Sequence, residues 1–188
     1  MDTIKGTVVS VHAGSNADLS KEAQASIQVE LDGIVGDRHR GYTRKCWAGD
    51  KQPEGSIRRN ERQWSAVSVE ELAEIAADMG ATGSIDAASV GANLCIENIP
   101  ALSRLPKGTL LKFASGAALI VEEYNPPCKD MSEIQGELHG VPATSFSKAS
   151  TLKRGIVGVV EAAGIITAGD EVTVVLYETP SWLVRTAD

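Results

Sequence analysis

The feature that most constrains the fold is a series of short strand-like segments that regular helices do not separate. They cover residues 3–12, 26–35, 93–96, 109–114, 117–124, 155–162 and 170–177. The pattern is clear in 26–35, where apolar and polar side chains alternate as in a strand buried on one face. A doubly wound α/β sheet would need a helix between successive strands. The sequence therefore predicts a mainly β fold, a closed or nearly closed barrel with a few peripheral helices.

One segment has a clear helical pattern. Ser68 is a suitable N-cap residue, and Glu71 occupies the capping-box position three residues later. An apolar face with helical spacing runs from Leu72 to Met79, and Gly80 is placed to end the helix. Weaker patterns predict helices at 129–138 and 142–152, a tight hairpin turn at 115–116, and connections without regular structure at 14–25, 37–63 and 164–169.

Length and charge narrow the class of protein. A chain of 188 residues can form one domain over residues 1–188, and an aromatic content of 4% makes its core mainly aliphatic. The net charge of −7 argues against binding of nucleic acid. No apolar run reaches the roughly 20 residues that span a bilayer, and the start of the chain lacks a signal-peptide pattern. Three cysteines, an odd number, argue against a disulfide framework, so the expected location is the cytoplasm.

Residues 37–63 carry a local excess of positive charge, with eight lysine or arginine residues against four acidic ones. A concentrated basic segment in an acidic chain favours a small anionic ligand over a long polyanion. Arginine forks bind phosphate oxygens in pairs, which makes Arg38, Arg58, Arg59 and Arg62 candidates for an anion site, together with His39. The alternative is an exposed loop whose arginines form weak ion pairs with acidic residues elsewhere.

Cys128 is the candidate reactive group. It follows the apolar segment 118–124 and two prolines, and Lys129 comes directly after it. A neighbouring positive charge favours the thiolate, which is the nucleophilic and metal-binding form of cysteine. The alternative is that Cys128 is packed and inert, as most lone cysteines are. Cys46 and Cys95 are expected to be structural, and the three cysteines have no CxxC or zinc-like spacing.

Six segments in order make the chain similar to the MOSC domain family, which is named for the C-terminal region of molybdenum-cofactor sulfurase. They include a Gly-x-Asn-Leu element at 91–94 and a Pro-Cys pair at 127–128, and the others are residues 33–39, 62–71, 105–110 and 155–172. Two departures from the family pattern stand out. Thr109 stands where the family usually has aspartate, and Asn125 and Pro126 stand where it often has arginine.

The resemblance implies a barrel like that of pyruvate kinase and a reactive cysteine, Cys128, that carries sulfur as a persulfide or binds the metal of the molybdenum cofactor. It also associates the family with pyridoxal phosphate binding. Asn93 would offer its amide to the edge of a pterin, and Glu122 is selected by its family position. Residues expected around a cofactor are Asp37, Arg38, His39, Arg58, Arg59, Arg62, Asn93, Glu122 and Lys129.

Three functions stay open at this point. The first is sulfur transfer, with a cysteine desulfurase or another sulfur donor as partner. The second is a molybdenum-cofactor-dependent oxidoreductase, because some relatives reduce N-hydroxylated compounds. The sequence shows no ferredoxin-like cysteine cluster, so its electrons would come from a separate electron-transfer protein. The third, from another class, is a non-catalytic β-barrel that binds a small anionic ligand or a protein partner.

Overall fold

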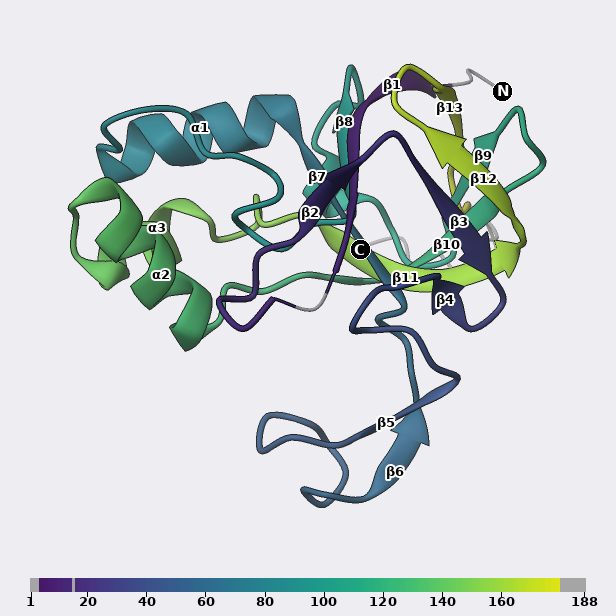
Figure 1. Cartoon of the computed structure of the whole chain (residues 1–188), viewed down its shortest axis with the longest axis horizontal. Coiled ribbons are helices and arrows are strands. Elements are labelled where there is room, and N and C mark those ends of the chain that lie inside the picture. Colours follow the sequence, from purple (N-terminus) through teal and green to yellow (C-terminus); the bar gives the residue numbers. More distant parts are fainter. Residues whose placement is uncertain (1–3, 15, 180–188) are drawn as a thin grey trace, which may run out of the picture.

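Seven strands close into a barrel in the computed structural model, which describes residues 4–14 and 16–179 (Figure 1). They are β1 (Ile4–Ala13), β7 (Trp64–Ser68), β8 (Leu94–Glu97), β9 (Leu110–Phe113), β10 (Ala118–Tyr124), β11 (Ile156–Ala162) and β13 (Glu171–Val175). Neighbours pair in the order β13, β9, β10, β11, β7, β8 and β1, and β1 pairs with β13 to complete the ring. The predicted mainly β fold with a closed barrel is confirmed.

The interior of the barrel is filled mainly by aliphatic side chains, as the low aromatic content predicts. Trp64 and Phe113 are exceptions in this core. The indole nitrogen of Trp64 donates to the backbone carbonyl of Val159 at 3.0 Å, so the buried ring leaves no donor unpaired. Trp64 is the first residue of β7, so its buried ring lies where the chain passes from the basic segment into the barrel.

Short strands outside the barrel correct three sequence predictions. The single strand predicted at 26–35 is two strands, β3 (Ser26–Glu30) and β4 (Gly33–Ile34), which form a hairpin. The predicted connections contain β2 (Glu22–Gln24), which pairs antiparallel with the end of β1, and β12 (Gly164–Thr167), which pairs with β3. The partner of β12 is distant in the sequence, and the local sequence does not reveal such a pairing. Thr3, the predicted start of the first strand, lies outside the described residues.

The segment 37–63 contains a projecting hairpin instead of an irregular loop. Its strands β5 (Thr43–Lys45) and β6 (Ile57–Arg59) pair with each other, and residues 43–59 form what we call the hairpin arm. Figure 1 shows the arm extending away from the barrel. Both strands are largely exposed, with no face turned to a core. The apolar alternation by which a strand is predicted is therefore missing here.

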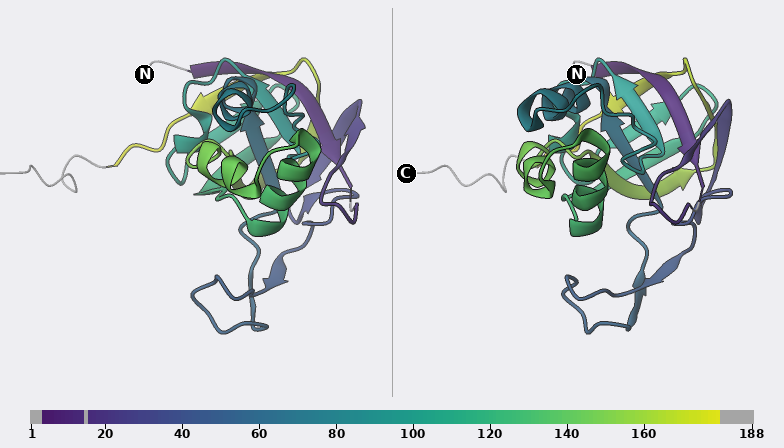
Figure 2. Two further views of the ribbon diagram at one scale, coloured as in Figure 1. Left: turned by 90° about the vertical axis from the view of Figure 1, so that its left-hand side faces the viewer. Right: turned by 60° about the vertical axis from the view of Figure 1, so that its left-hand side comes forward.

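Three helices group together at one side of the barrel (Figure 2). They are α1 (Val69–Met79), α2 (Lys129–His139) and α3 (Ala143–Ala149). The predicted caps of α1 are confirmed, since Ser68 accepts from the backbone of Glu71 at 3.1 Å and Gly80 is left-handed. The Glu71 carboxylate does not complete a capping box and accepts instead from the hydroxyl of Ser103 at 2.7 Å. No helix in the described part of the chain is long and apolar enough to cross a membrane.

Replacing Gly158 by alanine is expected to lower the free energy of unfolding by about 3 kcal/mol. Gly158 lies in β11, where an added Cβ would lie 1.8 Å from the carbonyl oxygen of Ile120 and 2.6 Å from Cζ2 of Trp64. Relief would need a shift of the β10 backbone, which is held in the barrel. The matched control is Gly83→Ala, where nothing lies within 4 Å. Urea denaturation of both variants checks this, and equal stability of the two would contradict it.

Candidate active site

A cavity of about 160 Å³ opens at the place where β7, β11 and the start of α2 approach one another. Its wall carries the sulfur of Cys128 together with the basic side chains of Arg38, His39, Arg62 and Arg154. These residues come from three distant parts of the chain, the basic segment, the start of α2 and the start of β11. The fold therefore brings the candidate thiol and part of the basic segment into one site.

Cys128 is the N-cap residue of α2 and is exposed. Its backbone is extended, and its carbonyl oxygen accepts from the amide of Ser132 at 3.0 Å and from the Ser132 hydroxyl at 2.8 Å. The side chain caps nothing, so the sulfur is free to react. Because the N-terminus of a helix carries partial positive charge, it favours an anion at this position. Lys129 contributes less than the sequence predicts, since its side chain is 84% exposed and lies 3.7 Å from Glu133.

Two of the three arginines that line the cavity, Arg62 and Arg154, are at least partly buried, whereas Arg38 is exposed. Arg154 is 7% exposed and donates from Nη2 to the carbonyl of Val90 at 2.9 Å, while its buried Nε has no hydrogen-bond partner. Arg62 donates from Nη2 to Oδ1 of Asn125 at 2.6 Å. Burial lowers the pKa of Arg154 to about 10, and the charge of Cys128 acts in the opposite direction. Arg154 therefore stays protonated at pH 7, and the charge of Cys128 favours this protonated form.

Arg154 is the functional residue that sequence reasoning missed. It lies between the predicted helix at 142–152 and the apolar strand that follows, directly before Gly155. One local signal was available, a single arginine at the start of a central strand. The core rarely needs a charged side chain at such a position. The sequence separation of Arg154 and Cys128 did not indicate that the start of β11 would place Arg154 beside the cysteine.

The wall of the cavity is supported from behind by a buried ion pair. The side chains of Lys21 and Asp37 are both 0% exposed and contact each other directly. Asp37 also accepts from Nδ2 of Asn93 at 2.8 Å and from the backbone amide of His39 at 2.9 Å. Neither Asp37 nor Asn93 lines the cavity. They hold its wall in place, since Oδ1 of Asn93 accepts from the amide of Ser65, which does line it, at 3.0 Å.

The charges behind the wall have shifted pKa values. Burial alone would raise the pKa of Asp37, but hydrogen bonds from His39 and the charge of Lys21 outweigh it, so this pKa lies well below its usual range. Partial loss of hydration lowers the pKa of His39 more than its hydrogen bond to Asp37 raises it, although the side chain is 43% exposed. At pH 7 the imidazole is therefore mainly neutral. Its Nδ1 lies 3.2 Å from Oδ1 of Asp37, which fixes the orientation of the ring.

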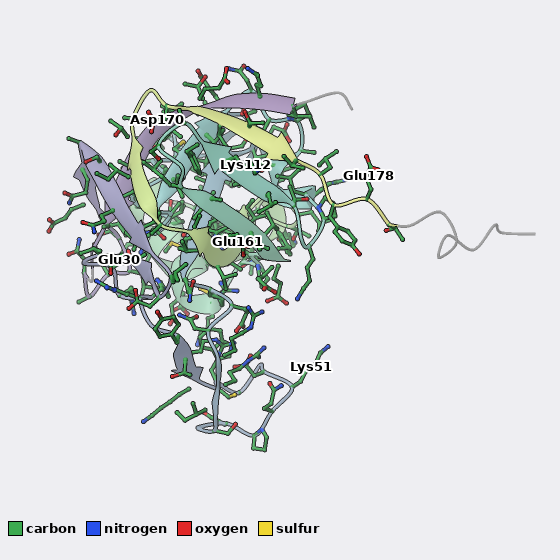
Figure 3. The ribbon with its side chains drawn as sticks, turned by 90° about the vertical axis from the view of Figure 1, so that its right-hand side faces the viewer. Glu30, Lys51, Lys112, Glu161, Asp170 and Glu178 are labelled. Atoms are coloured by element: carbon green, nitrogen blue, oxygen red, sulfur yellow. The ribbon has the colours of Figure 1, made fainter. Side chains whose placement is uncertain are left out.

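Other residues selected from the sequence lie outside the cavity lining. Arg58 pairs with Asp50 at 2.6 Å inside the hairpin arm. Arg59 and Lys107 both pair with Glu122, each at 2.6 Å. Arg58 and Arg59 therefore form ion pairs with acidic residues, which is the alternative to an anion site that the sequence left open. Figure 3 shows that Lys51, another cation of the segment, lies on the loop of the arm and away from the barrel.

Metal-binding capacity is limited in the part of the chain that the structure describes. No group of three or more histidine, cysteine, aspartate or glutamate side chains comes close enough together there to hold an ion. A metal at the cavity would find Cys128 and His39 among the lining residues and would need further ligands from elsewhere. The arrangement as it stands combines one accessible sulfur with a small, positively charged cavity.

Comparison with known proteins identifies the family. The MOSC domain profile matches residues 36–173. YuaD of Bacillus subtilis (strain 168), whose name connects it with metal-sulfur cluster biosynthesis, is 39% identical over 158 residues, which is 81% of each chain. The crystal structure of the Bacillus subtilis YUAD protein superposes with a TM-score of 0.90 at 31% identity, covering 94% of this chain and 99% of that one. YiiM of Geobacillus stearothermophilus shares the fold, with a TM-score of 0.63 at 16% identity over 90% of this chain and 75% of its own. This chain therefore belongs to the MOSC domain family.

Proposed function

We propose that the protein is a sulfur carrier in which Cys128 accepts a sulfane sulfur as a persulfide and passes it to an acceptor. The observation that supports this most directly is the exposed Cys128 at the N-terminus of α2, in a cavity with two arginines that form no ion pair within the described residues. Reactive cysteines occur in such electropositive, partly exposed surroundings. The name of YuaD adds support, because building a metal-sulfur cluster requires activated sulfur.

The transfer can be written with the residues present. The thiolate of Cys128 attacks the terminal sulfur of a persulfide on the donor, and a new S–S bond forms. The S–S bond of the donor breaks, and its inner sulfur leaves with the electron pair as a thiolate, which then takes up the proton that the terminal sulfur carried. Arg62 and Arg154 stabilise the negative charge that stays on the Cys128 persulfide. The proposed donor is a cysteine desulfurase or another protein that carries sulfur.

Two cofactors that the family suggests fit the cavity poorly. A thiolate and two arginines match the chemistry of the molybdenum cofactor, which would supply a metal centre and a phosphate. However, the cavity of about 160 Å³ is smaller than the roughly 300–1,000 Å³ typical of pockets that hold cofactors. Pyridoxal phosphate would need a lysine for its Schiff base, and no lysine is among the residues that line the cavity. No step of the proposed transfer uses either group.

The carrier function predicts that only Cys128 gains a sulfur atom. The protein is incubated with a cysteine desulfurase and cysteine, and peptides are measured by mass spectrometry. We expect an added mass of about 32 Da on the peptide with Cys128. Cys46 and Cys95 are buried and serve as internal controls in the same sample. The variant Cys128→Ser should show no adduct, and an unmodified Cys128 in the wild-type protein would contradict the proposal.

A further inference from the structure

The cavity beside Cys128 contains positive charge that the protein itself does not neutralise. Within residues 4–14 and 16–179, Arg62 and Arg154 have no carboxylate within ion-pair distance. By contrast, the arginines of the arm, such as Arg44 and Arg58, pair with Asp50 at 2.6 Å. The charge of Cys128 can offset one of these two guanidinium groups, and the other indicates that a ligand supplies a further negative charge.

Arg154 gives the second, independent indication. It is more than nine-tenths buried, it lines the cavity, and its Nε is a buried donor without a partner. Buried donors of this kind normally have a hydrogen-bond partner. Nη2 is already used by the carbonyl of Val90. Nη1 has no hydrogen-bond partner among the described residues and is not one of the fully buried atoms, so an oxygen of an anion in the cavity can bind it on the same wall as Cys128.

We propose that the cavity binds a small oxoanion that itself carries a sulfane sulfur, with thiosulfate as the simplest member, and that this anion is a direct sulfur donor to Cys128. The inference rests on the proposed carrier function and names a substrate for it. The size of the cavity favours a ligand of a few heavy atoms. The sulfonate oxygens face Arg62 and Arg154, and the outer sulfur faces the thiolate.

The reaction balances without an oxidant or reductant. The Cys128 thiolate attacks the outer sulfur of thiosulfate and forms a new S–S bond. The S–S bond of thiosulfate breaks, and sulfite leaves with the electron pair. The products are the Cys128 persulfide anion and sulfite, which carry the same total charge as the reactants. Cyanide can then take the sulfur from Cys128 as thiocyanate and return the thiolate, so turnover can be followed.

The test uses the full chain with sodium thiosulfate as the probe. We expect one sulfite released for each persulfide formed on Cys128, and thiocyanate production when cyanide is present. Arg154→Gln should raise the thiosulfate concentration needed for half-maximal rate about 10-fold to 100-fold, because it removes a charge-assisted hydrogen bond. Arg154→Lys should recover part of the loss. The control is Arg104→Gln, an exposed arginine that does not line this cavity.

A second measurement is independent of whether Arg154→Gln folds. Iodoacetate is an anion, whereas iodoacetamide is a neutral reagent of similar size. In the wild-type protein, sodium sulfate should slow the reaction of Cys128 with iodoacetate, whereas sodium chloride at equal ionic strength should not. Protection by sulfate supports an anion site beside the sulfur, and equal effects of the two salts contradict it.

The outcomes separate this inference from the carrier function. Persulfide formation with cysteine desulfurase but none with thiosulfate overturns the inference and leaves the carrier function standing. Formation with thiosulfate that Arg154→Gln leaves unchanged overturns the assigned role of Arg154. No persulfide on Cys128 with either donor overturns both proposals.

Discussion

Iodoacetamide is expected to modify Cys128 in the native protein at least about 100-fold faster than Cys46 or Cys95. Cys128 is exposed, whereas Cys46 is 4% and Cys95 is 6% exposed. Burial raises the pKa of the Cys95 thiol to about 11, so about one thiol in a thousand is ionised at pH 8. Cys46 also accepts a hydrogen bond from the hydroxyl of Ser56 at 3.3 Å. A quenched time course with peptide mass spectrometry measures the three rates.

The same experiment after unfolding provides its control. In guanidinium chloride the three cysteines should react at similar rates, because burial no longer distinguishes them. A Cys128 that resists labelling in the native protein and reacts only after unfolding would show that it is packed. That result would favour the non-catalytic barrel, in which the cysteine has no chemical role.

The parts of the fold that could be predicted are those whose residues carry a local pattern. The segment that became β10 is apolar and is followed by prolines, and α1 combines a cap at Ser68 with a stop at Gly80. β7 could not be predicted because all five of its residues are buried, which removes the alternation of a half-buried strand. The arm lacks the pattern for the opposite reason, since neither of its faces is covered.

The candidate site also has residues that the sequence could identify and residues that it could not. Cys128 could be selected because the Pro-Cys pair and the preceding strand are continuous in the sequence. Charge alone could not separate Arg62, which lines the cavity, from Arg58, whose partner Asp50 lies in the arm. Arg154 depends on a contact that exists only when β11 and α2 meet, so no local feature could reveal it.

Replacing Asp37 by asparagine is expected to lower the free energy of unfolding by about 3–5 kcal/mol at pH 7. The change leaves the Lys21 ammonium fully buried without its counter-charge, and a hydrogen-bond acceptor of Asn93 becomes a weaker one. Burial lowers the pKa of Lys21 and the charge of Asp37 raises it, so the lysine of the variant should release its proton more readily. Urea denaturation gives the free energy. The matched control is Asp78→Asn, which breaks an exposed pair with Lys153 and should cost at most about 1 kcal/mol.

The loss caused by Asp37→Asn should also depend on pH in a defined direction. The pKa of Asp37 is lower in the folded protein than its ordinary value of 3.8, so the unfolded chain takes up the proton first as the pH falls. The stabilisation is therefore complete above about pH 5 and decreases as the pH falls through 3.8 towards the folded value. The stability difference between wild type and Asp37→Asn should shrink over that range. A difference that stays constant down to pH 3, or that matches that of Asp78→Asn at pH 7, would mean that the carboxylate behind the cavity wall does not hold Lys21 as the structure indicates.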